Sequence, residues 1–212
     1  MPRPSNTEER RAQITGALVK VMARRGYDGA SIADIAKAAR LTPGLVHYHF
    51  KNKQQILLAA LHELVARHDA RLEARLASAG GDPAAELDAF IDFHLGLGAD
   101  EDPQALACWI LLSGEALRDA KVRVEFEKAL AATVARVAQA LRRGVEQQVF
   151  ACDADDVDAA ASALVAAVQG YFVLAASAAA LIPRGTAATS TKRMADGLLR
   201  PTRGAARGQA RR

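Results

Sequence analysis

Apolar side chains recur at intervals of three and four residues along most of this chain, which is the spacing of one buried face of an α-helix. Residues 122–148 are a clear example, with Leu130, Val134, Val137 and Leu141 on one face. The pattern predicts nine helices and no strand, over about residues 7–25, 32–39, 43–49, 53–79, 83–98, 103–118, 122–148, 157–181 and 186–199. Alanine is abundant and aromatic residues make up 5% of the chain, which suits closely packed helices. The predicted fold class is therefore all-α.

Two short helical patterns stand close together near the start of the chain. Ser31 is a good N-cap for the first, and apolar residues at helical spacing follow it. Thr42 caps the second, Pro43 occupies its first helical position, and the pattern ends at about His49. The residues between the two patterns leave room only for a sharp turn. Helices joined in this way form a helix-turn-helix, here over about residues 31–50, whose second helix enters a DNA major groove.

The residues in and around this motif follow a recognisable pattern. They read Gly26-Tyr27, Ser31-Ile32-x-x-Ile35-Ala36, Leu41-Thr42-x-Gly44 and Tyr48-x-Phe50-x-x-Lys53. This pattern resembles the DNA-binding signature of TetR-type (TetR/AcrR-like) transcriptional regulators. The resemblance is dense over roughly residues 10–62, and beyond them it is one of size and helical layout. It implies a three-helix DNA-binding head followed by a larger helical body that binds a ligand and dimerises.

Three positions depart from the family's usual pattern. Arg40 stands where the family usually has a turn glycine, so the turn requires a non-glycine residue in a left-handed conformation. Leu45 stands where a small polar residue is frequent, and His47 stands where a tyrosine is frequent. The last two departures bear on which bases are preferred and leave the expected fold unchanged.

The candidate DNA-binding residues lie on the second helix of the motif and beside it. They are Ser31, Arg40, Thr42, Pro43, Gly44, Leu45, His47, Tyr48 and Lys53. The resemblance implies phosphate contacts for Thr42, Tyr48 and Lys53. Gly44 lets the helix backbone approach DNA, Leu45 could meet a thymine methyl group and His47 could donate one hydrogen bond to a base. Arg40 is either a phosphate ligand or simply solvated, whereas Val46 and Phe50 have the character of core residues.

The charges are distributed unevenly along the chain. Residues 1–53 carry ten Lys/Arg against four Asp/Glu, residues 54–199 carry thirteen against twenty, and residues 200–212 carry five arginines and no acid. A basic end on an acidic body is suited to a chain of which one end approaches a polyanion. We therefore expect three segments: a DNA-binding domain over residues 1–53, a ligand-binding and dimerisation domain over residues 54–200, and a disordered basic tail over residues 201–212.

Large or polar-tipped side chains of the second domain are candidates for lining a ligand pocket. They are Phe90, His94, Trp109, Glu115, Phe126, Tyr171 and Phe172. Any one of them is more typically a packed core residue, but together they describe a mostly apolar pocket with a few polar groups. His94 and Glu115 are the polar members of greatest interest. The ligand expected here is a small-molecule inducer that the sequence does not identify.

The helix predicted over residues 157–182 carries small side chains on much of its surface. One interpretation is a central helix buried within a single subunit. The other, which the resemblance favours, is that this helix and the helix at 186–199 pair with their copies in a four-helix homodimer interface.

Other classes of protein find little support in the sequence. His62 and Glu63 begin like a zinc-protease motif, but His68 lies six residues after His62, so the two imidazoles do not share a face. Cys108 and Cys152 lack metal-binding spacing and are expected to be free thiols in the cytoplasm. No catalytic group, metal or cofactor is expected. The most apolar stretch, residues 159–182, is only weakly hydrophobic, so no membrane span is expected.

The sequence thus predicts a homodimeric, ligand-responsive transcriptional regulator, a repressor that binds a pseudo-palindromic double-stranded operator and leaves it when an inducer binds. Two alternatives remain open. One is a nonspecific architectural DNA-binding protein that uses the arginine tail, and the other is a helical enzyme or carrier.

Overall fold

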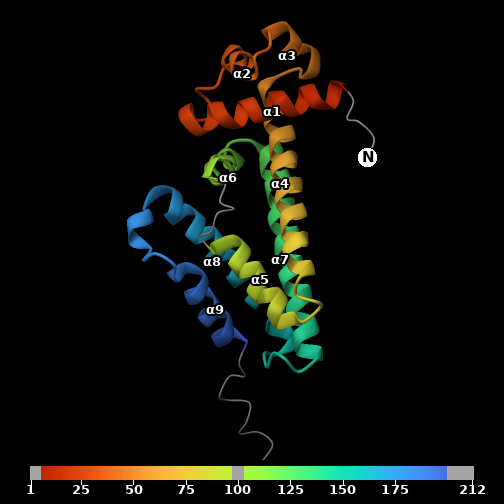
Figure 1. The fold of residues 1–212 in the computed structure, drawn as a ribbon, viewed down its shortest axis with the longest axis vertical. Helices are drawn as coiled ribbons and strands as arrows, with labels where there is room; N and C mark the ends of the chain where they lie inside the picture. Colours follow the sequence, from red (N-terminus) through yellow and green to blue (C-terminus); the bar gives the residue numbers. More distant parts are fainter. Residues whose placement is uncertain (1–5, 97–102, 200–212) are drawn as a thin grey trace, which may run out of the picture. The chain divides into compact units, whose positions relative to one another are not determined.

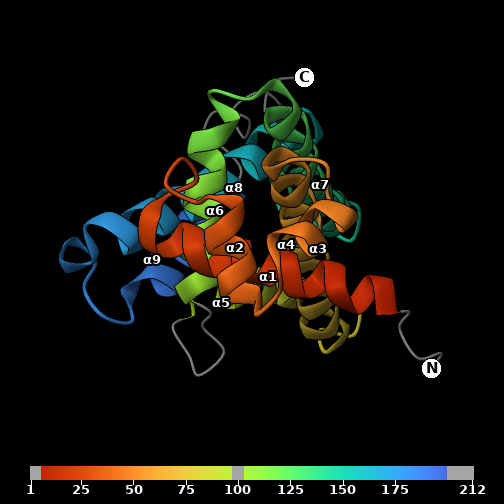
Figure 2. The same ribbon diagram turned by 90° about the horizontal axis from the view of Figure 1, so that it is seen from above.

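The computed structural model describes residues 6–96 and 103–199, and within them the chain folds into nine α-helices and two short 3-10 helices, with no strand (Figures 1 and 2). The α-helices are α1 (Asn6–Arg25), α2 (Ile32–Ala39), α3 (Pro43–His49), α4 (Lys53–Ala77), α5 (Pro83–Leu95), α6 (Pro103–Ala116), α7 (Ala120–Glu146), α8 (Val157–Ser177) and α9 (Thr186–Leu198). The 3-10 helices are η1 (Ala154–Asp156) and η2 (Ala179–Leu181). The prediction of an all-α fold is confirmed, while the tail over residues 201–212 lies outside the described residues.

The end of α8 differs most from the prediction. The sequence pattern continued to Leu181, but the helix ends at Ser177, and Ala178 leaves the α-region with φ −150° and ψ 44°. A continuous helix would bring the ring of Pro183 against the carbonyl of Ala179, four residues earlier. The chain instead forms η2 before it reaches Pro183. The other predicted helix ends lie within three residues of the observed ones.

Internal contacts divide the chain into two compact units. The first unit comprises residues 1–70 and 101–129, and the second comprises residues 71–100 and 130–212. Helices α4 and α7 contribute residues to both units. The domain limits at residues 53 and 200 stay a prediction.

The core of the first unit is built where α1 packs against α2, α3 and α6. Figure 1 shows α2 and α3 on the same side of α1. Ile14, Leu18, Ile35, Val46 and Phe50 are buried there, so the apolar faces seen in the sequence do meet. Val46 and Phe50 are thereby confirmed as core residues, and α3 is held by its buried side while its other side remains in solvent.

The core of the second unit is built from α5, α8 and α9 together with the later residues of α7. Its largest fully buried side chains include Leu72, Ile91 and Leu141. Ion pairs surround this core: Arg143 contacts Glu86, and the ammonium of Lys192 lies 2.8 Å from the carboxylate of Asp92. The small residues of α8 allow its neighbours to approach closely on the buried side.

Candidate nucleic-acid interface

Helix α2 begins with a complete capping box. The hydroxyl oxygen of Ser31 accepts a hydrogen bond from the backbone N–H of Asp34 (3.0 Å), and the Asp34 carboxylate accepts one from the backbone N–H of Ser31 (3.2 Å). The Ser31 hydroxyl also donates to that carboxylate at 2.5 Å. These bonds from Ser31, and then the charges of Arg25 and Lys37, lower the pKa of Asp34 below its ordinary value. Ser31 is exposed and fixes where the motif begins.

The turn between the two helices of the motif contains a left-handed residue that is not glycine. Arg40 has φ 56° and ψ 41°, and its backbone N–H bonds to carbonyls of the last turn of α2. The N–H of Leu41 bonds to the carbonyl of Ala36 at 2.9 Å. This is the hydrogen-bond pattern that ends many helices, usually with glycine at the left-handed position. The expectation of a left-handed Arg40 is confirmed.

Helix α3 presents the predicted DNA-binding residues to solvent. Thr42 caps the helix by accepting from the N–H of Leu45 at 3.3 Å, and Pro43 occupies its first turn. Five of the predicted residues are exposed along this helix: Thr42, Pro43, Gly44, His47 and Tyr48. Leu45 is half-buried, and Tyr48 is 80% exposed, which is unusual for a large aromatic side chain. The exposed side of α3 therefore carries hydrogen-bonding and apolar groups that could contact bases in a DNA groove. The role of each individual residue stays a prediction.

Lys53 already makes contacts within the protein. Its ammonium donates to the backbone carbonyl of Tyr27 at 2.8 Å and lies 4.1 Å from the centre of the Tyr27 ring. An ammonium has three donors, so this bond leaves capacity for a phosphate oxygen. Asn52, directly before it, caps α4 by accepting from the N–H of Gln55 at 2.9 Å. Lys53 thus helps to hold the head together through Tyr27, and it is also a candidate phosphate ligand.

Within the first unit, the corner between α6 and α7 is bonded to the start of α4 and to the loop that precedes α2. The side-chain amide of Gln54 donates to Asp119, and Arg118 lies 3.2 Å from the carboxylate of Asp28. Burial, and then the negative charges of Glu115, Asp119 and Asp28, raise the pKa of Tyr27 to about 12. The amide of Gln54 is the first cause that lowers the pKa of Asp119.

The sequence did not predict these contacts. They join residues 65 and 90 positions apart, so no local pattern could have indicated them.

The predicted ligand-lining residues fall into two groups, one in each compact unit. In the second unit His94 donates from Nδ1 to the carbonyl of Phe90 (2.8 Å), and its ring lies 6.1 Å from that of Phe172. Tyr171 is half-buried against the same core. In the first unit the rings of Trp109 and Phe126 stack at 4.5 Å, and Glu115 is half-buried on the same helix as Trp109. The two groups are distinct aromatic clusters, and a ligand role for either stays a prediction.

Two surface cavities border α1 and α2 in the head, and neither includes a residue predicted to line a ligand pocket. Within residues 6–96 and 103–199, no group of three His, Cys, Asp or Glu side chains is arranged to hold a metal ion. Within the described residues, neither Cys108 nor Cys152 forms a disulfide bond. Burial raises the pKa of Cys152 above its ordinary value.

Comparison with known protein families gives two matches along the chain. Residues 14–60 match the model described as "Bacterial regulatory proteins, tetR family". Residues 83–200, more than half of the chain, match the model described as "BetI-type transcriptional repressor, C-terminal". The first match spans α2 and α3 and the buried residues of α1 that hold them.

Individual proteins are similar over most of the chain. The HTH-type transcriptional regulator BetI of Rhizobium meliloti is 27% identical over 175 residues, which are 82% of this chain and 81% of that protein. A transcriptional regulator of Saccharomonospora viridis, solved in complex with choline, is 25% identical to this chain with a TM-score of 0.74. The alignment covers 90% of this chain and 95% of that protein's chain. A TetR transcription regulator from Haloarcula marismortui has a TM-score of 0.76 at 18% identity, and the alignment covers 91% of this chain and 97% of that protein's chain. At this identity the similarity supports the fold alone.

Proposed function

Because this chain belongs to the TetR family of bacterial helix-turn-helix transcriptional regulators, we propose that it is a repressor that binds its operator as a homodimer and is released by a small-molecule inducer. The main support for this proposal is the burial pattern of α3. Val46 is buried in the head, whereas His47 and Tyr48 are exposed to solvent. A helix held in this way can enter a major groove without losing its own packing. The proteins of this family are regulators and not enzymes, and we expect this one to act in the cytoplasm.

The proposed dimer rests on the exposed side of α8. Ala159, Ala163, Ala166, Gly170 and Val173 are exposed and follow one another at intervals of three and four residues. They form a continuous strip of small and apolar side chains, which we call the α8 strip. On α9, which packs against α8, Met194 and Leu198 are also exposed. Side chains of this kind gain free energy when a second copy covers them.

The apolar composition of α8 also matches that of a membrane helix, by length and composition only. The stretch Ala154–Ser177 is long and apolar enough to cross a bilayer, and 28% of an apolar 18-residue window within it is buried in the single chain. A dimer interface accounts for the same composition, because a second copy would cover the exposed small and apolar side chains of the α8 strip. We therefore favour a dimer over a membrane span.

The operator follows from the dimer. Two copies of α3 related by a two-fold axis would enter successive major grooves, at a spacing of about 34–36 Å or a multiple of it. The half-sites would then form a pseudo-palindrome. Within each half-site Leu45 and His47 are the residues that we expect to distinguish bases, and Thr42, Tyr48 and Lys53 are those that we expect to contact phosphates.

We propose a small cation of the quaternary ammonium class, with choline as its first candidate, as the inducer. Two observations support this class: the similar Saccharomonospora viridis protein binds choline, and Trp109 and Phe126 provide stacked aromatic faces half-buried or buried on α6 and α7. A cation over an aromatic face is attracted by the ring quadrupole, with tryptophan the strongest partner. Glu115, on the same helix as Trp109, would supply the opposite charge.

The same unit offers a route from such a ligand to the head. Helix α6 leads directly to the corner at which Arg118 and Asp119 bond to Asp28 and Gln54. A ligand that fits only one position of α6 would favour one arrangement of these bonds. It would shift the equilibrium by its difference in affinity for the two arrangements and by no more.

The test uses the full-length protein and a duplex from the region upstream of its own gene, with random duplex DNA as competitor. Fluorescence anisotropy should show binding to the upstream duplex that survives an excess of random DNA. Choline should release the protein, whereas 3,3-dimethylbutanol, the neutral isostere of choline, should not. Equal binding to both duplexes would instead support the architectural alternative, and absence of binding to either would support a helical carrier.

Variants locate the ligand. Trp109→Leu should abolish release by choline while it leaves DNA binding in the absence of choline unchanged. Phe172→Leu, in the aromatic cluster of the second unit, is the matched control and should keep the response. Loss of the response in the control alone would place the ligand at His94 and Phe172 instead.

A further inference from the structure

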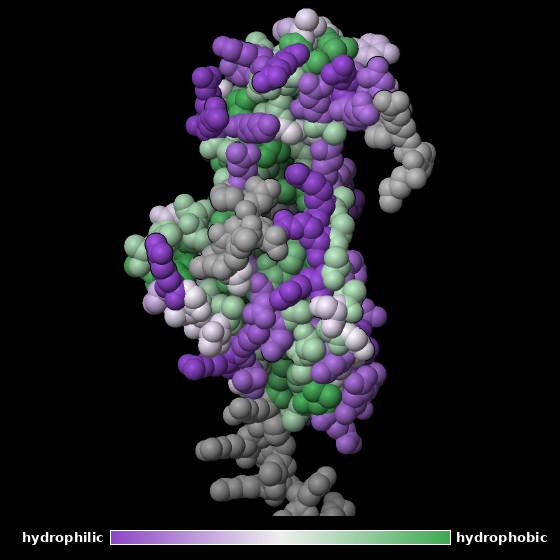
Figure 3. All heavy atoms as spheres, viewed as in Figure 1, coloured by the Kyte–Doolittle hydropathy of each residue, from purple (hydrophilic) through white to green (hydrophobic). Residues whose placement is uncertain are grey.

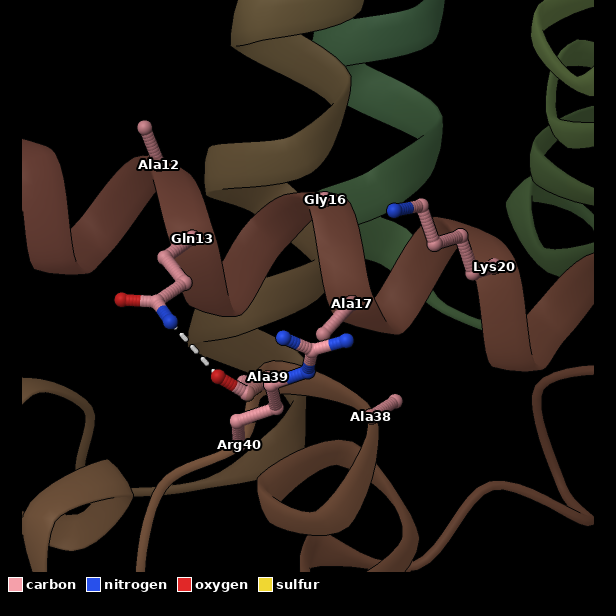
Figure 4. Close-up of a pocket in the computed structure, with 8 residues that line it drawn as sticks. All are labelled: Ala12, Gln13, Gly16, Ala17, Lys20, Ala38, Ala39 and Arg40. Atoms are coloured by element: carbon pink, nitrogen blue, oxygen red, sulfur yellow. Dashed lines mark hydrogen bonds between the residues drawn. The ribbon is translucent and has the colours of Figure 1, made fainter.

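Helices α1 and α2 border a groove that no residue of α3 lines. It consists of two adjoining cavities of about 290 and 450 Å³, which share Lys20 and Ala38. Figure 4 shows the guanidinium of Arg40 turned toward α1 and the side chain of Lys20 extending along α1 toward Gly16. We call this feature the α1–α2 groove. No candidate DNA-binding residue other than Arg40 borders it.

The α1–α2 groove is strongly basic. Its cationic side chains are Lys20, Arg24, Arg25, Lys37 and Arg40, and Asp34 is its one carboxylate. That carboxylate is already engaged: it accepts from Ser31, lies 3.2 Å from Arg25 and interacts with the charge of Lys37. In the described part of the chain, no carboxylate forms an ion pair with the side chains of Lys20, Arg24 or Arg40. Hydrophilic side chains accordingly cover much of the surface around α1 and α2 (Figure 3).

We propose that the α1–α2 groove is a second DNA contact, which binds the phosphate backbone of duplex DNA that flanks the half-site entered by α3. The inference rests on the proposed function. Arg40 lies at one end of the groove and is separated from the first residues of α3 by Leu41 and Thr42 alone. A duplex held by α3 is therefore already close to that end. From Ala12 to Arg25 the groove follows α1 for about 20 Å, at 1.5 Å per residue.

Charge and length together favour a polyanion as the occupant. Duplex DNA carries one charge for about each 1.7 Å of its axis, so several phosphates lie within the length of the groove. Small residues also keep the groove open: a Cβ added at Gly16 would meet no heavy atom within 4 Å, and Ala38 is exposed. A row of cations beside an open floor fits a continuous backbone better than it fits one small anion.

The proposal is tested by the salt dependence of binding to a random-sequence duplex of about 40 base pairs, with the full-length protein. Each phosphate contact contributes about 0.9 to the slope of log K against log salt. Lys20→Gln with Arg24→Gln should lower that slope by about two, so that the variant loses about ten-fold less affinity than the wild type between about 50 and 200 mM salt. The matched control, Arg67→Gln with Arg75→Gln on α4, removes the same charge and should keep the wild-type slope.

A second variant distinguishes direct contact of DNA with the groove from long-range attraction between DNA and the positive charge of the head. Gly16→Met fills part of the groove without any change in charge, and it should weaken binding several-fold if the backbone lies there. Circular dichroism checks that each variant folds, and if the double variant does not, Gly16→Met decides alone. A wild-type slope in the double variant, wild-type affinity in Gly16→Met, or equal losses in groove and control variants overturns the inference. A wild-type protein that binds no duplex at all contradicts the proposed function instead.

Discussion

Arg40 combines a left-handed backbone with a position that we propose to contact DNA. Its left-handed conformation is needed to end α2 and to start α3 within three residues, and its side chain borders the α1–α2 groove. A β-carbon in this region of φ and ψ costs about 1 kcal/mol or more. Glycine would adopt the same turn without that cost, so the arginine is retained at the expense of head stability. Strain of this kind is expected where a side chain has a role outside the fold.

Arg40→Gly should stabilise the protein by about 1 kcal/mol, because it removes the β-carbon from a left-handed position. The same change should weaken DNA binding, because it removes a cation from the groove. Urea-induced unfolding followed by circular dichroism measures the first effect. Arg40→Ala is the control: it removes the charge but keeps the β-carbon, so it should weaken binding without any gain in stability. Equal stability of the glycine and alanine variants would show that the turn is unstrained.

Tyr27 is a second residue whose environment can be measured directly. Burial, and then nearby carboxylates, raise its pKa to about 12, so the neutral phenol is favoured in the folded protein. Its contribution to stability is fully present below its ordinary pKa of 10.0 and is lost as the pH rises through about 12. The absorbance of tyrosinate should therefore include a late component that Tyr27→Phe removes. Asp119→Asn should move that component to lower pH, and a component that does not move would separate Tyr27 from the corner of α6 and α7.

At the scale of elements, the helix-turn-helix is specified by its own caps. Ser31 and Thr42 start the two helices, Arg40 ends the first, and Pro43 suits the first turn of the second. Helix α3 has seven residues, too few to be stable alone, so the caps and the buried Val46 must hold it together. Helix α8 is the opposite case. It is long and apolar, and its limits are set by residues such as Pro183 outside it.

Ser31→Ala should destabilise α2 by about 1 kcal/mol at neutral pH, the usual cost of a lost N-cap. The pKa of Asp34 is lowered in the folded protein, so its bonds with Ser31 contribute stability above the ordinary pKa of 3.8, and this is lost as the pH falls through the lower value. The difference between wild type and variant should therefore shrink in acid. Hydrogen exchange of the α2 amides at neutral pH, and urea unfolding at neutral and acid pH, measure these effects. A constant difference at all pH values would show that Asp34 does not take part in the cap.

At the scale of the whole molecule, charge and apolar surface are placed at different ends of the sequence. Residues 1–53 carry the excess of basic residues, and residues 54–199 carry the excess of acidic ones. The α8 strip belongs to the acidic part. One head contacts only a few base pairs, so useful discrimination requires two heads at a fixed separation. The α8 strip is the surface that we expect to provide it.

Gly170→Arg should separate the subunits. A Cβ added at Gly170 meets no heavy atom within 4 Å in the single chain, so an arginine there fits the monomer, but it places a charge in the middle of the α8 strip. Sedimentation at micromolar concentration should show a monomer with unchanged circular dichroism, and operator affinity should fall by orders of magnitude. Gly114→Arg is the control, because Gly114 on α6 is equally open and lies outside the strip. A wild type that is monomeric and still binds a palindrome tightly would rule out the proposed dimer.

The sequence by itself determined the elements of this protein. Caps, turns and apolar spacing act between residues up to about four positions apart, and such signals can be read along the chain. They placed α2 and α3 and the burial of Val46 and Phe50, whereas the left-handed Arg40 was expected from the resemblance to the family, which usually has glycine there. The exposed face of α3 followed from the same periodicity, since burial of one side of a helix leaves the other in solvent.

Tertiary structure decided which elements meet. Gln54 bonds to Asp119, which lies 65 positions later, and Asp28 pairs with Arg118, which lies 90 positions later. No local sequence pattern links residues so far apart. The α1–α2 groove likewise exists because packing brings Lys20 and Arg24 beside Lys37, although each looks like an ordinary surface cation in the sequence. The ammonium of Lys53 meets Tyr27 for the same reason. Helix formation is a local process, whereas the pairing of helices depends on the shape and burial of whole surfaces, which a linear pattern does not contain.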